Sequence, residues 1–132
     1  MKLVDTSVVV KWFVAEEGQA EAELLIGESL AAPDLLLVEV SNALWKKWRK
    51  RELEAEQATM AQGMVASFVE LRPSRPFAEQ ALAIALQLEH PVYDCFYLAM
   101  SEAVGIPLVT ADQRLLGRCK GTRFEPLLEA LA

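Results

Sequence analysis

The sequence lacks most of the features that mark secreted, zinc-binding or membrane proteins. Only two cysteines occur, Cys95 and Cys119, and their spacing matches neither a metal site nor a redox pair. The sequence contains no run of about 20 apolar residues and no cleavable apolar leader, so we expect neither a membrane span nor export. Low-complexity segments and internal repeats are absent as well. These absences favour a cytoplasmic protein.

Basic residues are also fewer than acidic residues. The 132 residues include 13 Lys and Arg against 19 Asp and Glu, which gives a formal net charge of −6. This balance argues against broad electrostatic attraction to nucleic acid, but it leaves room for local basic patches and for cations that offset clustered carboxylates. With 53% hydrophobic and 24% charged residues, the composition is that of a globular protein. The length favours a single domain over residues 1–132.

Apolar periodicity and turn residues predict short strands that alternate with helices. We expect strands at residues 2–4, 70–72 and 106–110, and an extended link at residues 31–33. Helices are expected at residues 7–15, 16–30, 35–51, 54–69, 77–89 and 94–104, and again after Asp112. This alternation favours an α/β fold with a mainly parallel sheet.

Three aspartates stand close to the ends of predicted elements. Asp5 ends the first strand and Asp112 closely follows the last one, so right-handed crossovers would bring both to the carboxyl edge of the sheet. Functional crevices of such sheets lie at this edge. Asp94 begins the helix that leads into the last strand. Each aspartate also fits a competing interpretation, a helix cap that accepts bonds from the first free N–H groups.

Glu39 is harder to explain as a cap, because it lies inside a predicted helix, LLLVEVSNALWKK. An ionised carboxylate among apolar residues needs a solvent-lined cleft or a cation; the alternative is an ordinary surface position. Helical spacing places Asn42 beside Glu39, and Lys46 and Lys50 further along the same face. A polar stripe therefore leads away from Glu39.

Four acids are then candidates for one site: Asp5, Glu39, Asp94 and Asp112. Packed together they would repel one another, and a bound divalent cation is the usual remedy. Carboxylate oxygens favour Mg²⁺ or Mn²⁺, with some of the acids bound through water. Such ions activate water for in-line attack on phosphodiesters, so no covalent protein nucleophile is required.

The segments around these acids resemble one known family. Asp5 lies in VDTSVVVKWF, Glu39 lies in LLLVEVSNALWK, and the other two acids lie in HPVYDCFYLAMSEAVGIPLVTADQRL. In this order and spacing, over almost the whole chain, the segments are similar to those of PIN-domain nucleases and, among these, of VapC-type toxins of prokaryotic toxin–antitoxin pairs. The resemblance implies a three-layer α/β/α fold, an endoribonuclease that depends on Mg²⁺ or Mn²⁺, and a homodimer neutralised by a small antitoxin.

The resemblance also implies roles for individual residues. All four acids match the family's catalytic positions; Asp5 and Asp94 would hold the metal most directly, and the other two would act through water or a second ion. Supporting hydroxyl groups are expected from Thr6, Ser7 and Thr110, which match the family. Asn42 is expected to support the site because helical spacing, not the resemblance, places it beside Glu39. Cleavage is expected to leave a 5′-phosphate and a 3′-hydroxyl.

Basic and aromatic residues in the helix expected at 35–51 indicate partners. Lys46 and Lys50 are candidate RNA contacts because they share the face of Glu39; an ordinary solvated face is the alternative. Trp45 and Trp48 either fill the core or line a groove for the antitoxin. His90 is the only histidine, precedes Pro91, and is expected in a structural or solvent-facing position without a catalytic role.

Other functions compete with the nuclease. A phospho-receiver domain also has an aspartate at a strand end, but this chain has no acidic pair after its first strand. A haloacid-dehalogenase-like phosphatase needs an aspartate two residues beyond the first, where this chain has Ser7. The third alternative is a catalytically silent PIN module that binds RNA or protein. Metal-dependent cleavage would separate that module from the nuclease.

Overall fold

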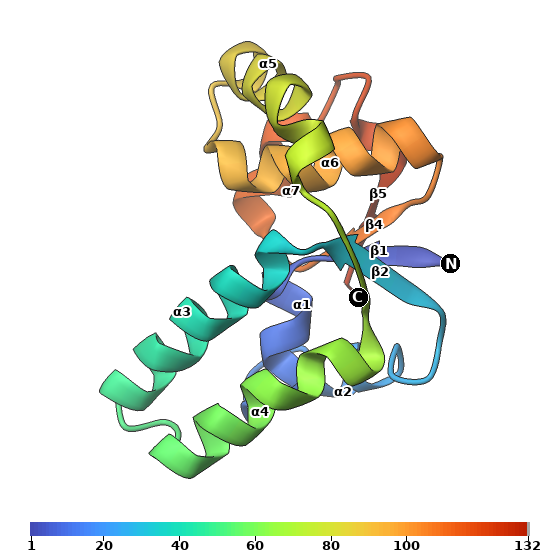
Figure 1. Cartoon of the computed structure of the whole chain (residues 1–132). Coiled ribbons are helices and arrows are strands. Elements are labelled where there is room, and N and C mark those ends of the chain that lie inside the picture. The colour runs from blue at the N-terminus through green and yellow to red at the C-terminus, as the bar shows by residue number, and fades with distance from the viewer. Residues whose placement is uncertain (132) are drawn as a thin grey trace.

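A five-stranded parallel sheet forms the centre of the computed structural model, which describes residues 1–131 (Figure 1). The strands are β1 Lys2–Val4, β2 Leu30–Pro33, β3 Glu70–Arg72, β4 Leu108–Thr110 and β5 Leu128–Ala130. Their order across the sheet is β3-β2-β1-β4-β5, and each neighbouring pair is parallel. The chain therefore crosses from one side of β1 to the other between β3 and β4.

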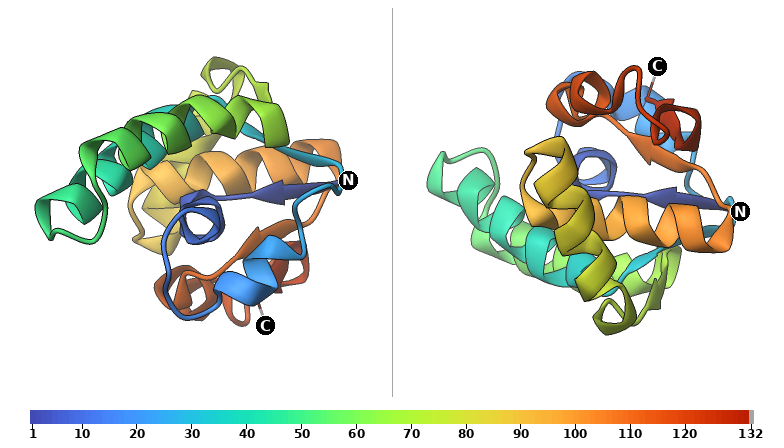
Figure 2. Two further views of the ribbon diagram at one scale, coloured as in Figure 1. Left: turned by 90° about the horizontal axis from the view of Figure 1, so that it is seen from below. Right: turned by 90° about the horizontal axis from the view of Figure 1, so that it is seen from above.

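Helices cover both faces of the sheet, which confirms the predicted three-layer α/β/α fold. The first group lies on one face and consists of α1 Thr6–Val9, α2 Gln19–Glu23, α3 Leu35–Arg49 and α4 Ala55–Phe68. The second group lies on the opposite face (Figure 2) and consists of α5 Ala78–Leu88, α6 Val92–Val104 and α7 Gln113–Cys119. Short 3-10 turns occur at Val10–Trp12, Arg75–Phe77 and Glu125–Leu127. Within residues 1–131, none of these helices is long and apolar enough to cross a membrane.

Fully buried apolar side chains hold the layers together. Leu3 of β1, Leu108 of β4 and Leu98 of α6 have no exposed surface. Ala31 and Ala32 of β2 are also fully buried, and their small side chains let α6 pack against this strand. Removal of apolar surface from water is the main favourable term in folding. The resulting core fixes β1 beside β4, so that the residues following these two strands lie at one edge of the sheet.

Two predicted elements differ most from the structure, and one strand is missed. Residues 31–33, expected as a link, belong to β2; alanine has little preference for strands, and pairing with β1 and β3 decides its conformation. The helix expected at 16–30 shrinks to α2, since the positive φ angles of Gly18 (86°) and Gly27 (97°) interrupt helical backbone. β5 is not predicted, because it is short, partly exposed and paired only with β4.

Trp45 and Trp48 lie at the surface. Each residue is 47% exposed, and both line a groove between α3 and α4 together with Ala58. Trp12 provides a contrast, because it is 8% exposed and its indole N–H donates to the backbone carbonyl of Ala22 at 2.8 Å. The interpretation that Trp45 and Trp48 fill the core is therefore wrong.

This difference predicts unequal effects of tryptophan truncation on stability. Trp12→Ala should lower the free energy of unfolding by about 3–5 kcal/mol, because it empties a buried space. Trp48→Ala should cost about 1 kcal/mol or less, since its ring already contacts water. Guanidinium unfolding of both variants and the wild type measures the two losses. Equal losses would show that Trp48 belongs to the core.

Candidate active site

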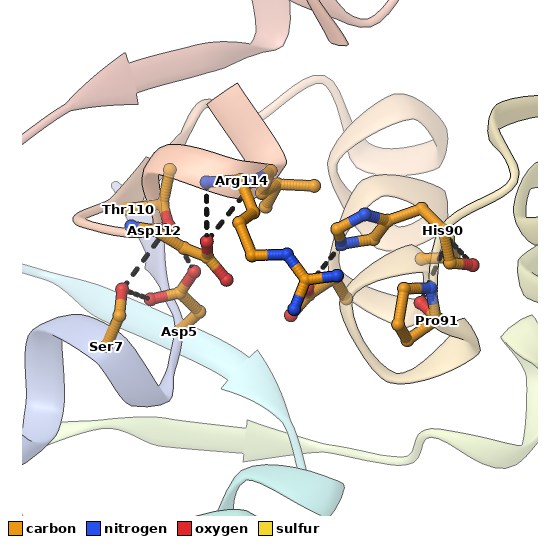
Figure 3. Close-up of polar contacts among 10 residues, drawn as sticks. Asp5, Ser7, His90, Pro91, Thr110, Asp112 and Arg114 are labelled. Atoms are coloured by element: carbon orange, nitrogen blue, oxygen red, sulfur yellow. Dashed lines mark hydrogen bonds and ion pairs between the residues drawn. The ribbon is translucent and has the colours of Figure 1, made fainter. Parts of the chain in front are cut away.

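Asp5 lies where β1 ends and α1 begins. It is 3% exposed, and its carboxylate accepts hydrogen bonds from the hydroxyls of Ser7 and Thr110 (Figure 3). The Ser7 hydroxyl also accepts a bond from the backbone N–H of Ala111 at 2.9 Å. Asp5 occupies the N-cap position of α1, but its side chain accepts no bond from a backbone N–H of the first turn, so the capping interpretation is wrong for this residue. Its carboxylate instead connects the start of α1 with the end of β4.

Asp94 approaches from the opposite layer, in the first turn of α6. Its Oδ2 atom lies 2.6 Å from Nε2 of His90, which precedes it by one helical turn. His90 is 7% exposed, so of the two positions expected for it the structural one is correct and the solvent-facing one is wrong. The imidazole of His90 fixes the orientation of the Asp94 carboxylate.

Glu39 extends from α3 and is bound by two hydroxyl groups. Its Oε1 atom accepts hydrogen bonds from the phenol of Tyr97 at 2.7 Å and from the hydroxyl of Thr6 at 3.3 Å. Tyr97 is 1% exposed and stands about one turn beyond Asp94 on α6. Glu39 is therefore neither an unpartnered core residue nor an ordinary surface glutamate.

Asp112 is both a helix cap and an acid at the sheet edge. Its Oδ1 atom accepts bonds from the backbone N–H groups of Arg114 at 2.9 Å and Leu115 at 3.2 Å, in the first turn of α7 (Figure 3). The capping interpretation is correct for this aspartate. Both bonds end on the same oxygen, so the cap is compatible with a second role for Oδ2.

Burial and mutual repulsion raise the pKa values of three of these acids. Desolvation is the largest cause; it raises the pKa of Asp5 from 3.8 to about 7, although the hydrogen bonds from Ser7 and Thr110 act in the lowering direction. The charges of Asp94 and Asp112 raise the pKa of Asp5 further. Desolvation also raises the pKa values of Asp94 and Glu39, with added repulsion from Asp112 on Asp94 and from Asp94 on Glu39. The four carboxyl groups thus influence one another electrostatically.

This donor set suits a hard divalent cation, because it consists of carboxylate oxygens with hydroxyl groups beside them. Within residues 1–131, no three His, Cys, Asp or Glu side chains already surround a common point. A preformed cage of that kind is not required, since small divalent ions often keep several waters and take only one or two carboxylates. Carboxylates that repel one another are also expected to move closer only when a cation offsets their charge.

Comparison with known proteins identifies the family, because residues 2–120 match the family model described as PIN domain. The chain belongs to the PIN-domain family. Ribonuclease VapC3 of Pyrobaculum aerophilum is 34% identical over 121 residues, which cover 87% of this chain and 92% of the relative. Ribonuclease VapC1 of Mycobacterium tuberculosis is 34% identical over 118 residues, which cover 86% of each chain. A chain in the structure of a toxin–antitoxin complex from Klebsiella pneumoniae has a similar fold, with a TM-score of 0.73 at 16% identity and coverage of 100% of this chain and 98% of that one.

Membership of the PIN-domain family removes two of the competing functions. The phospho-receiver and haloacid-dehalogenase interpretations are wrong, because one PIN-domain match spans residues 2–120 and includes all four acids. A silent PIN module remains compatible with the family assignment.

The PIN domain brings most of the predicted supporting residues to the acids. Hydroxyl groups that hydrogen-bond to the acids come from Thr6, Ser7 and Thr110. Asn42 and Lys46 line a cleft that also contains Glu39. Lys50 lies at the exposed end of α3 and does not line this cleft.

Two residues of the PIN-domain site, His90 and Tyr97, are missed by sequence reasoning. Tyr97 follows Asp94 by three residues on one helix, a spacing that places both side chains on neighbouring parts of the same face. His90 precedes Asp94 by four residues, but the intervening Pro91 suggests a break between them. Helical spacing from Asp94 in both directions is the signal that would have found them.

The raised pKa of Asp5 predicts how the stability of the metal-free protein depends on pH. The folded protein holds the Asp5 proton more tightly than the unfolded chain does, so the free energy of unfolding should fall as pH rises from about 4 to about 7. Each tenfold difference in proton affinity corresponds to about 1.4 kcal/mol, so Asp5 accounts for about 4 kcal/mol at most. Denaturant unfolding in EDTA at pH 5 and pH 8 measures the fall.

The matched variant for this measurement is Asp5→Asn, which resembles the protonated acid and cannot ionise. Its stability should depend less on pH than that of the wild type, and at pH 8 it should be the more stable of the two. If both proteins lost the same free energy between pH 5 and pH 8, Asp5 would not be the titrating group.

Proposed function

We propose that this PIN-domain protein is a metal-dependent endoribonuclease and the toxin of a VapBC-type toxin–antitoxin pair. The observation that carries the proposal is the position of Asp5, a carboxylate 3% exposed at the switch point between β1 and β4, with the charges of Asp94 and Asp112 acting on it. Open α/β sheets bind ligands in the crevices that form at such switch points. Two relatives at 34% identity are named as VapC ribonucleases, which supports the same activity here.

The proposed metal ligands are the four acids. Asp5 and Asp94 hold Mg²⁺ or Mn²⁺ most directly, and Glu39 and Asp112 act through water or at a second ion. The bound cation supplies Lewis acidity, which lowers the pKa of water and offsets the negative charge that develops on a phosphodiester. Water would attack the phosphorus in place of the ribose 2′-hydroxyl, and the bond from phosphorus to the 3′-oxygen would break. The 3′-oxygen would leave with a proton, so the products would be a 3′-hydroxyl and a 5′-phosphate.

The chain's other residues hold these acids in position. The hydroxyls of Ser7 and Thr110 fix Asp5, the phenol of Tyr97 fixes Glu39, and the imidazole of His90 fixes Asp94. Each carboxylate keeps capacity for a further partner, since an ionised carboxylate has two oxygens and about four acceptor positions. These contacts favour an active enzyme over the silent PIN module, because they hold the acids ready for a cation.

Lys46 and Lys50 are proposed to contact RNA phosphates. Lys46 shares a cleft with Glu39, and Lys50 continues the same face of α3 to its exposed end. Phosphate contacts position a strand without reading its sequence. Two lysines near the acids let a protein with a net charge of −6 bind RNA locally. We also propose that the protein acts in the cytoplasm, where RNA is available as its substrate.

The groove that holds Trp45 and Trp48 is proposed as the antitoxin site. Half-exposed tryptophans in a groove between two helices fit an apolar helix or an extended tail of a small partner. The similar fold found in a toxin–antitoxin complex supports such a partner. We also propose that the protein forms a homodimer through other surfaces. Light scattering would test this by measuring the mass of the assembly.

The nuclease proposal predicts metal-dependent cleavage of single-stranded RNA. The purified protein should cut RNA with Mg²⁺ or Mn²⁺ and stop in EDTA. Asp5→Asn and Asp94→Asn should each reduce cleavage to background, because each removes a carboxylate charge that holds the cation. Gel analysis of a labelled RNA gives the rates, and circular dichroism checks that the variants fold.

A matched control for Asp94→Asn is Glu102→Gln. Glu102 lies on the same helix, α6, but pairs with Arg123 at 2.9 Å. The rate of RNA cleavage by Glu102→Gln should equal that of the wild type. Cleavage that persists in EDTA, or normal cleavage by Asp94→Asn, would refute the proposed chemistry.

The antitoxin proposal predicts that Trp48→Ala weakens antitoxin binding by on the order of 2 kcal/mol, the scale of an interface hot spot. RNA cleavage by the variant should be nearly unchanged. Calorimetric titration with the cognate antitoxin measures the affinity. Leu86→Ala is the control, because Leu86 is 72% exposed on α5 and lies outside the groove. Unchanged affinity in Trp48→Ala would place the antitoxin elsewhere.

A further inference from the structure

Tyr93 is an exposed aromatic residue next to a proposed metal ligand. It precedes Asp94 in the first turn of α6 and is 61% exposed. Tyr97, one turn further along, is 1% exposed and holds Glu39. The two tyrosines therefore have different environments on one helix: Tyr97 is buried against Glu39, and Tyr93 is exposed to solvent.

The ring of Tyr93 lines a cleft of about 480 Å³ between α3 and α6. The cleft is shared with residues of the proposed active site and with α3, among them Thr6, Val38, Glu39, Asn42 and Lys46. Thr6 and Glu39 also belong to the acid cluster, where Thr6 donates to Glu39. Any molecule that fills the cleft therefore contacts the acid cluster as well.

The chemistry of the lining matches an unpaired nucleobase. Tyr93 and Val38 give the lining an aromatic and an aliphatic side chain, and the Asn42 amide has both donor and acceptor groups for a base edge. Bases in single-stranded RNA are commonly bound by stacking on aromatic rings and by hydrogen bonds to their edges. Glu39 disfavours a phosphate inside the cleft, whereas Lys46 is suited to a phosphate at its rim. None of the ion pairs within residues 1–131 involves Lys46.

We propose that this cleft binds one unpaired base of the RNA substrate, next to the phosphodiester that is cut. The base stacks on Tyr93, its edge meets the Asn42 amide, and the adjoining phosphate pairs with Lys46. This subsite rests on the proposed nuclease function and assigns Tyr93 a role in substrate recognition.

The test compares Tyr93→Ala with Tyr93→Phe on a single-stranded oligoribonucleotide that carries a fluorescent label. A set of these RNAs has the base removed from one nucleotide at a time, with the ribose and phosphate kept. In the wild type, removal of the base beside the cut should lower kcat/KM roughly tenfold to hundredfold, the range that corresponds to loss of one stacked base. Tyr93→Ala should show that loss with the intact RNA and almost no further loss when the base is removed.

Tyr93→Phe should behave like the wild type, because it keeps the ring. Leu86→Ala on α5 controls for truncation of any exposed apolar side chain. The inference is overturned if base removal costs the wild type and Tyr93→Ala the same factor. It is also overturned if Tyr93→Ala weakens only antitoxin binding, since the cleft would then belong to the protein partner.

Binding measured without turnover separates this inference from the nuclease proposal. The Asp5→Asn protein is expected to bind RNA without cleaving it. Fluorescence anisotropy would measure its affinity for the intact RNA and for the RNA that lacks the base, and the measurement is repeated with the Asp5→Asn, Tyr93→Ala double variant. A wild type that cuts none of these RNAs refutes the nuclease proposal. In that case the base subsite would still be supported if removal of the base weakened binding only when Tyr93 is present. The subsite would be rejected if removal of the base did not weaken binding.

Discussion

The buried carboxylate of Asp5 is the constraint on which the arrangement of this site depends. A carboxylate 3% exposed needs hydrogen-bond donors, and here they come from Ser7 on α1 and Thr110 on β4. Asp5 therefore couples the first element of the chain to an element more than a hundred residues later. The same contact holds the end of β4 in the position from which Asp112 begins α7. Packing of the sheet fixes the positions of the strands, and the hydrogen bonds of Asp5 fix the positions of the ends of β1 and β4.

Each acid has hydrogen-bond donors that belong to the fold, and this explains how a small core tolerates several carboxyl groups. Hydroxyls serve Asp5, a phenol and a hydroxyl serve Glu39, an imidazole serves Asp94, and backbone N–H groups serve Asp112. Desolvation still raises the pKa values of Asp5, Glu39 and Asp94, so the donors offset only part of the cost of burial. A cation that entered this site would stabilise it, because its positive charge would offset the remaining repulsion between the carboxylates.

Sequence reasoning finds the acids because their positions follow from local rules. Asp5 and Asp112 follow apolar strands, and a parallel sheet brings such positions to one edge. It fails where tertiary context decides the structure. Ala31 and Ala32 become a strand only because β1 and β3 flank them, and β5 exists only through its pairing with β4. Helical spacing from Asp94 could have placed Tyr97 near the site, but its bond to Glu39 could not be predicted, because Glu39 lies on a different helix.

α3 separates two surfaces that a toxin has to keep distinct. Residues of a helix advance by about 100° each, so Glu39, Asn42 and Lys46 lie on one side and Leu44 and Trp48 lie on nearly the opposite side. The structure has the same division, since the first three line the cleft beside the acids and the other two line the groove against α4. If the antitoxin binds in the tryptophan groove, as proposed, it need not occupy the proposed base subsite in order to bind. Inhibition would then require that a further part of the antitoxin reach around α3 toward the acids, so affinity and inhibition would depend on different faces of one helix.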